Sequence, residues 1–250
     1  MALFSGFEGA MGRWVVVSNY LKPFLEENGW TIDLYTANSR IHFSNPNTGQ
    51  HYDCVSGTST PDLNIAACLG YNSGAAYNAQ PGHLGVTVCR LGTYGATDFS
   101  YFYNCGNDIH NSLLYNGSWN SNSFFHIENK IANWAGGQGL AAASLGSGAG
   151  ILVNVDGVGR VGYGTHGNTP LYQGPMEWNR SSYLVPVLMC VNDWVETSAN
   201  KIPVGYLSDM YSCSPGSDFL RNEIVTINGN DHIWAVIGTT WCLVRLRARP

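Results

Sequence analysis

The stretch WTIDLYTANSRIHFSNPNTGQHYDCV, residues 30–55, decides the fold class. Apolar side chains occupy every second position of its first part, as Ile32 and Leu34 show, and the same period returns at Ile41 and Phe43. A period of two places successive side chains on opposite faces of an extended chain. The stretch therefore predicts half-buried β-strands.

A turn cluster separates these strands from the next one. Residues 45–49 read Asn-Pro-Asn-Thr-Gly, and each of these residue types favours a reversal of the chain. Residues 52–55 are then expected to form the returning strand. The stretch is thus a candidate antiparallel meander.

Immediately before this stretch, residues 13–28 have a helical period. Apolar side chains recur at spacings of three and four, which predicts one amphipathic helix with an almost entirely apolar face. Pro23 removes one internal hydrogen bond and is expected to kink or divide the helix. Gly29 is expected to end it. The residues on the predicted face are Trp14, Val17, Leu21, Phe24, Leu25 and Asn28.

Downstream of the stretch, short strands are expected throughout the chain. Two tight hairpins have clear signals: residues 151–155 and 158–163 join across Asp-Gly, and residues 223–227 and 232–237 join across Asn-Gly. Both dipeptides tolerate the positive φ angles of such turns. Residues 124–134 are expected to form a second short helix. The other expected strands are residues 65–69, 84–91, 99–103, 183–191 and 241–247.

This pattern predicts a mainly β protein, an antiparallel β-sandwich or barrel-like architecture with one N-terminal amphipathic helix. We expect residues 1–30 to form a helical segment packed on the sheet, and residues 31–135 to form a first β region. Residues 136–150 are expected to be a Gly-rich loop, and residues 151–250 a second β region. Whether the two β regions form one continuous domain is left open by the sequence.

The composition limits the classes of partner. The chain has 250 residues, 12% of them charged, with a formal net charge of -5. It has no basic stripe, so nucleic acid is not an expected partner, and no apolar run long enough to predict membrane insertion. Its uncharged polar surface suits either a protein packed among many neighbours or a secreted β protein. No secretory leader is recognisable at the start, so we expect the chain to remain in the cytosol until any assembly is complete.

Motifs for catalysis, cofactors and metals are weak. The Gly-x-Gly-x-x-Gly pattern at residues 157–162 lacks the helix that nucleotide binding requires, and fits a hairpin instead. Ser144 lies in a near miss to a nucleophile elbow. The seven histidines are scattered and the seven cysteines form no Cys-x-x-Cys pair, so no metal or cofactor is expected, although ligands from distant strands could still converge. Buried free thiols are the expected state of the cysteines.

Aromatic residues in Asn- and Gly-rich segments are the candidate contact residues. They could form a glycan site, or pack loops down and fill an interface between subunits. The candidates are Tyr71, Tyr77, Trp119, Trp178 and Tyr183.

Several motifs, in order along the chain, carry a resemblance. An amphipathic helix closes on Asn-Gly-Trp and turns into a strand at residues 28–34, and residues 77–82 read Tyr-Asn-Ala-Gln-Pro-Gly, with one residue more before Gln-Pro-Gly than is usual. Residues 182–187 and 202–207 add two strand motifs, and residues 218–234 a hairpin before a last strand ending in Arg. In these features the chain resembles uncharacterised structural proteins of tailed-bacteriophage virions.

The resemblance implies a non-enzymatic component of the tail, baseplate, neck or fibre attachment, and brings no catalytic residues. We then expect homo-oligomers and contacts with other virion proteins, in a virion assembled in the bacterial host cytoplasm. The alternative is a host-receptor or glycan-binding module of the adsorption apparatus. A hydrolase acting through Ser144 is the weakest hypothesis.

Overall fold

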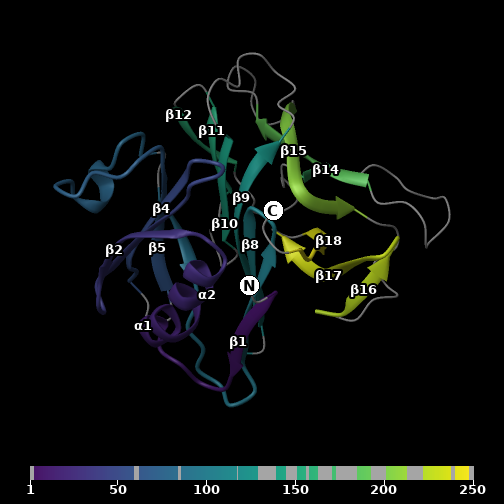
Figure 1. The fold of residues 1–250 in the computed structure, drawn as a ribbon, viewed down its shortest axis with the longest axis horizontal. Coiled ribbons are helices and arrows are strands. Elements are labelled where there is room, and N and C mark those ends of the chain that lie inside the picture. The colour runs from purple at the N-terminus through teal and green to yellow at the C-terminus, as the bar shows by residue number, and fades with distance from the viewer. Residues whose placement is uncertain are drawn as a thin grey trace.

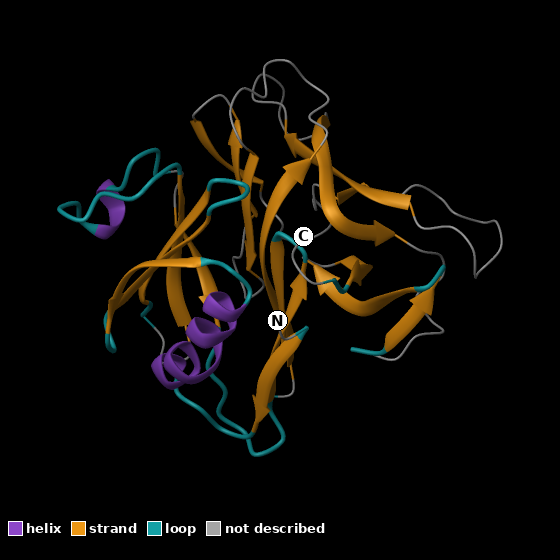
Figure 2. Cartoon of the chain, viewed as in Figure 1, coloured by secondary structure: helices purple, strands orange, loops and turns teal. Residues whose placement is uncertain are grey.

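The protein is described from a computed structural model. The residues it describes are 3–58, 62–83, 86–116, 118–128, 139–144, 151–155, 158–162, 171–172, 185–192, 201–212, 222–237 and 240–247. Within them the chain is mainly β, with antiparallel sheets arranged like a sandwich and a helix near the N-terminus (Figures 1 and 2). The predicted fold class is therefore confirmed.

The predicted helix forms as three consecutive segments. These are α1 (Arg13–Val16), the π-helical turn η1 (Val17–Leu21) and α2 (Lys22–Glu27). The Lys22 N–H bonds to the Val17 carbonyl, five residues back. This widened turn directly precedes Pro23, whose missing N–H prevents a regular α-helical bond. The residues of the predicted apolar face are all buried: Trp14, Val17, Leu21, Phe24, Leu25 and Asn28.

Gly29 ends this helix, as predicted. Its φ is +74°, a left-handed conformation that costs glycine little. The Trp30 N–H bonds to the Leu25 carbonyl at 2.9 Å and the Gly29 N–H to the Glu26 carbonyl at 3.1 Å. These two bonds form a Schellman motif, which turns the chain directly into the first strand of the smaller sheet.

The smaller sheet is five-stranded and antiparallel, with neighbouring strands also consecutive in sequence. It lies beside the helix in Figure 1. The turn cluster at residues 45–49 sets the register of its central hairpin, which pairs Asn45 with Gln50 and Phe43 with Tyr52. Its strands are β2 (Thr31–Thr36), β3 (Arg40–Asn45), β4 (Gln50–Ser56), β5 (Asp62–Cys68) and β6 (Val86–Arg90).

The larger sheet contains the remaining described strands. Its main path runs β1-β7-β8-β9-β15-β18-β17-β16, and β10 to β14 join it by side branches. Its strands are β1 (Phe4–Glu8), β7 (Phe99–Cys105), β8 (Asp108–Tyr115), β9 (Ser118–Glu128), β10 (Gly139–Ser144), β11 (Ile151–Val155), β12 (Val158–Gly162), β13 (Leu171–Tyr172), β14 (Val185–Asn192), β15 (Lys201–Ser212), β16 (Ile224–Ile227), β17 (Asn230–Ile237) and β18 (Thr240–Arg245). One short 3-10 turn, η2 (Tyr77–Ala79), lies between β5 and β6.

One buried cluster joins the helix and both sheets. Phe124 of β9 packs edge-on against Phe43 and Tyr52, with ring centroids 5.3 and 5.1 Å apart. Phe24 of the helix lies 6.3 Å from Phe102 of β7. The helix therefore shares one buried core with both sheets.

Both predicted hairpins form. Val155 pairs with Val158 across the Asp-Gly position, and Ile227 pairs with Asn230. In the second turn Asn228 and Gly229 have φ angles of +51° and +75°, as a type I′ turn requires.

Two expectations about the middle of the chain were wrong or incomplete. Residues 124–128, predicted to begin a second helix, belong to strand β9, and residues 129–134 lie outside the described part. In the Gly-rich segment, residues 139–144 form strand β10, paired with β9 and β11. Small side chains do not prevent ladder formation when a neighbouring strand supplies the hydrogen bonds.

The boundary between the two β regions is also displaced. The smaller sheet ends with β6, and β7 to β9 belong to the same sheet as the strands after residue 150. Glu128 of β9 pairs with Tyr206 of β15. The sheets therefore divide between β6 and β7, and the two predicted regions share a sheet.

The two ends of the described chain meet at one residue of the β7 strand. The Asn104 N–H donates to the Leu3 carbonyl at 2.8 Å, and the Asn104 carbonyl accepts from the Arg247 N–H at 3.2 Å. Its side chain donates to Oδ1 of the buried Asn28 at 2.6 Å. Asn104 thus joins the helix end and both ends of the chain.

The four cysteines whose side chains are described are free and buried, as predicted: Cys54, Cys68, Cys89 and Cys105.

Candidate functional site

The smaller sheet has one hydrophobic face and one polar face. Phe43 and Tyr52 point into the shared core. Because side chains alternate along a strand, their neighbours His42, His51 and Asp53 point to the opposite face. His42 and Asp53 are fully buried there, which is unusual for groups that can carry charge.

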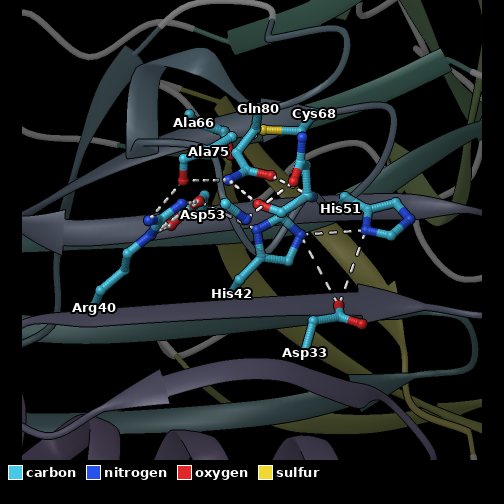
Figure 3. Close-up of polar contacts among 11 residues, drawn as sticks. Asp33, Arg40, His42, His51, Asp53, Ala66, Cys68, Ala75 and Gln80 are labelled. Atoms are coloured by element: carbon cyan, nitrogen blue, oxygen red, sulfur yellow. Dashed lines mark hydrogen bonds and ion pairs between the residues drawn. The ribbon is translucent and has the colours of Figure 1, made fainter.

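Two histidines and an aspartate converge on this polar face (Figure 3). His42 Nε2 lies 3.2 Å from His51 Nδ1. Oδ2 of Asp33 lies 3.9 Å from each of these two nitrogen atoms. The three side chains come from β2, β3 and β4, so the cluster connects three adjacent strands.

A β-bulge brings Asp33 into the cluster. Ile32 pairs with Phe43 and Leu34 pairs with His42, so Asp33 is the extra residue between them. A bulge re-aims the side chain of the extra residue. Oδ2 of Asp33 is buried without a hydrogen-bond partner among the described residues.

A second carboxylate, that of Asp53, contacts the ring nitrogen of the buried His42 that does not face His51. Oδ2 of Asp53 lies 3.2 Å from His42 Nδ1, and Arg40 Nε donates to Oδ1 of Asp53 at 2.9 Å. Burial by itself would raise the pKa of Asp53, but the interactions with His42 and Arg40 outweigh it and lower the pKa below its ordinary value. Asp53 is therefore ionised at neutral pH and orients the His42 ring.

His51 is the more accessible of the two histidines. Its side chain is 20% exposed and that of His42 is fully buried. Burial, followed by the nearby His42, lowers the pKa of His51 below its ordinary value. The neutral imidazole, which has a lone pair available to a ligand, is thus favoured at neutral pH.

The loop between β5 and β6 covers part of the cluster. Tyr71 lies over His42, with ring centroids 4.7 Å apart. Arg40 Nη1 and Gln80 Nε2 both donate to the Ala75 carbonyl, at 3.1 and 3.0 Å. Gln80 also makes two hydrogen bonds with the backbone of Asn72, through Oε1 at 2.8 Å and Nε2 at 3.1 Å. The buried Gln80 therefore fixes the loop over the polar face.

A neighbouring thiol is poorly suited to take part. Cys68 is the β5 partner of His51 in the register. Burial raises the pKa of Cys68 to about 12, so its sulfur stays protonated at neutral pH and is a weak ligand. The donors that the arrangement offers are two imidazole nitrogens and a carboxylate oxygen, which is a set that a metal ion could use.

Three of the five predicted contact residues lie in the described part of the chain, in two different elements. Tyr71 and Tyr77 are both half-buried in the β5–β6 loop, and the Tyr77 hydroxyl is buried. Trp119, expected in a loop, belongs to strand β9. Trp178 and Tyr183 lie outside the described residues. Among the side chains of this set that the structure describes, Tyr71 contacts the histidine cluster.

The histidine cluster itself was not predicted. His42 and His51 are nine residues apart and match no local metal motif. The signal that could have found them is the turn at residues 45–49, because a hairpin that pairs Asn45 with Gln50 necessarily pairs His42 with Asp53. The bulge at Asp33 leaves no comparable mark in the sequence.

The chain matches no model of a protein family and no curated protein sequence. Among the described residues, no helix has the length and apolar character to cross a membrane.

Proposed function

We propose that this chain is a structural component of a tailed-phage virion that assembles with copies of itself through the outer strands of its larger sheet. The proposal rests on the pairing of β1 and β16, the two strands at the ends of the main path of the larger sheet. In the described part of the chain, β1 pairs with β7 alone and β16 pairs with β17 alone. Each therefore has a second edge without a strand partner among these residues, and such an edge can form hydrogen bonds with another chain.

Both outer strands expose large apolar side chains. Phe4 of β1 is 58% exposed and Ile224 of β16 is 50% exposed. Proteins commonly protect open edges with Lys or Pro, but β1 reads Phe-Ser-Gly-Phe-Glu and β16 reads Ile-Val-Thr-Ile. The one charged residue of these two strands, Glu8, accepts a hydrogen bond from the Tyr101 hydroxyl at 2.9 Å. These edges therefore suit association with another sheet.

An aromatic surface continues from the β1 edge onto β7. The register places Phe4 opposite Tyr103 and Gly6 opposite Tyr101, so these side chains share a face. Phe99 and Tyr101 lie side by side, with ring centroids 5.4 Å apart, and both are partly exposed. Burying such a surface against a second copy would add a hydrophobic contribution to edge pairing.

Two different edges that pair head to tail generate a ring if the rotation closes and a filament if it does not. Rings and filaments of identical subunits are the kind of assembly that forms the layers of a tail, neck or baseplate. The low charged fraction of 12% limits repulsion between copies. The phage assignment itself rests on the resemblance of the order of motifs to that in virion proteins, and the proposed role needs no catalytic centre.

The test is the oligomeric state of the purified chain, measured by light scattering after size exclusion and by native mass spectrometry. We expect the wild-type chain to form closed rings or filaments. Phe4→Lys and Ile224→Lys should each shift it toward the monomer, because a charge on an open edge opposes pairing.

Val15→Lys is the matched control, since Val15 is 46% exposed but lies on the helix. It should leave the assembly unchanged. A wild-type chain that is monomeric at high concentration and absent from purified particles would overturn the proposal. The receptor-binding alternative predicts a different outcome: Trp119→Ala or Trp178→Ala would abolish adsorption to cells while particles still assemble.

A further inference from the structure

We infer that Asp33, His42 and His51 form a binding site for a divalent transition-metal ion of the zinc class. This site is independent of the proposed assembly, because its three side chains lie on the polar face of the smaller sheet. Two imidazoles and one carboxylate suit zinc and its neighbours, whereas calcium and magnesium prefer sites made entirely of oxygen atoms.

The distances between the donor atoms fit a shared ion. Zinc lies about 2.0–2.1 Å from histidine nitrogen, so two nitrogens of a tetrahedral site are separated by about 3.3 Å. His42 Nε2 and His51 Nδ1 are 3.2 Å apart. Oδ2 of Asp33, at 3.9 Å from each nitrogen, would need to move by only about half an ångström to complete three corners.

The buried oxygen of Asp33 is a second, independent sign of a ligand. A buried polar atom without a hydrogen-bond partner is unfavourable by about 1–3 kcal/mol. Oδ2 of Asp33 is such an atom among the described residues, and a bulge directs it at the two nitrogens. A cation between them would satisfy it.

The carboxylate next to His42 is an arrangement that is common in metal sites. A histidine ligand commonly donates its other ring N–H to a carboxylate, which fixes the tautomer and makes the free nitrogen more basic. Oδ2 of Asp53 lies 3.2 Å from His42 Nδ1, and its charge favours the ring proton on that nitrogen, while Arg40 holds Asp53 in turn. His42 Nε2 is thereby left as the acceptor that faces Asp33 and His51.

In the metal-free protein His42 Nε2 and His51 Nδ1 lie 3.2 Å apart, and with Nε2 of His42 as the acceptor the bond needs a proton on Nδ1 of His51. The ion would take the place of this proton, which would move through solvent to Nε2 of His51, so that both rings stay neutral and no oxidation or reduction is involved. The partly exposed side chains of Asp33 and His51 offer a route of entry, and Tyr71 covers the side of His42. Three protein ligands leave a fourth position to water.

Bound metal would tie together β2, β3 and β4, and so stabilise the outer strand of the smaller sheet. Any ligand that binds only the folded state raises the melting temperature. We expect saturating Zn²⁺ to raise the Tm of the chelator-treated full chain by about 5 °C or more.

The decisive measurement uses the full chain freed of metal by a chelator. Titration with Zn²⁺ in a calorimeter should show one site per chain, and Co²⁺ should give the visible absorption of a four- or five-coordinate ion. His51→Ala and the isosteric Asp33→Asn should each weaken binding by about tenfold or more. His83→Ala, a change at another half-buried histidine, should leave binding unaltered.

Wild-type ¹H–¹⁵N spectra of the imidazole rings keep the test valid if a variant fails to fold. The ring signals of His42 and His51 should move on addition of Zn²⁺, and those of His83 should not. Absence of Co²⁺ or Zn²⁺ binding, or binding that survives both variants, would overturn the assignment. Loss of metal with intact oligomers would leave the assembly proposal standing, so the two can fail separately.

Discussion

His42 Nδ1 lies 3.2 Å from Oδ2 of Asp53, its register partner on the neighbouring strand, and both side chains are fully buried. A buried charge of this kind is tolerated only when it is paired. Here Arg40 supplies the compensating charge, with a guanidinium group that binds both carboxylate oxygens.

Removing this carboxylate should strongly destabilise the metal-free protein. Asp53→Asn leaves the Arg40 guanidinium largely buried without its counter-ion, and we expect the free energy of unfolding to fall by about 3 kcal/mol. Urea denaturation at neutral pH measures the change. Asp33→Asn is the control, because no arginine of the described residues forms an ion pair with Asp33; its loss should stay below about 1 kcal/mol. Equal losses of unfolding free energy in the two variants would show that the Asp53 carboxylate contributes no more to stability than that of Asp33.

The helix end should depend on one glycine. Gly29 has a φ of +74°, so Gly29→Ala should lower the free energy of unfolding by about 1 kcal/mol. Gly12→Ala is the matched control, because Gly12 has a φ of -67° and open space where the alanine methyl group would lie. It should be neutral or slightly stabilising. A neutral Gly29→Ala would mean that the Schellman motif contributes little.

Acid should destabilise the protein through His110. Burial lowers the pKa of His110 to about 3, whereas a histidine in the unfolded chain titrates near 6.5. Between these values the unfolded state binds more protons, so stability is complete above about pH 6.5 and declines as pH falls, by up to about 1.4 kcal/mol per pH unit.

His110→Asn should remove this part of the slope while keeping a partner for Ser112, whose hydroxyl lies 3.3 Å from the His110 ring. Urea denaturation between about pH 4.5 and pH 7.5 compares the two proteins. His83→Asn should keep the wild-type slope. Identical slopes in wild type and His110→Asn would show that other groups set the acid sensitivity.

The loop over the polar face should open when its central amide is lost. Gln80→Ala removes the hydrogen bonds to Asn72 and Ala75. Amide hydrogen exchange in residues 71–80 should accelerate by about tenfold, with little change in the core strands. Asn78→Ala, at an exposed position of the same loop, should have no such effect. Faster exchange throughout the protein would indicate global destabilisation instead.

The elements with strong local signals were predictable from the sequence. The helix at residues 13–28 combines an apolar face with Pro23 and Gly29, and the Asn-Gly hairpin requires positive φ angles that few residues tolerate. In each case the physical cause lies within a few residues. Strand β10 was missed because Gly and Ala are poor strand formers, and pairing with β9 and β11 determines its structure instead.

The candidate site could not be predicted from local signals of this kind. It depends on the exact register of β3 and β4, on a bulge at Asp33 and on the β5–β6 loop, which the hydrogen bonds of Gln80 hold over the polar face. Of these three features, only the register has a local signal in the sequence, which is the turn between Asn45 and Gln50. Of the predicted contact residues, Tyr71 does lie at the cluster, with its ring tilted against that of His42.

Because Leu3 and Arg247 are both hydrogen-bonded to Asn104, a linker of a few residues could join them, and the chain could be reopened at an exposed turn such as the one at Asn228 and Gly229. Circular permutation of this kind would keep every strand pairing while changing the order in which strands leave the ribosome. A force that pulls residues 3 and 247 apart would act first on their two hydrogen bonds to Asn104, and so would enter the fold at a single point.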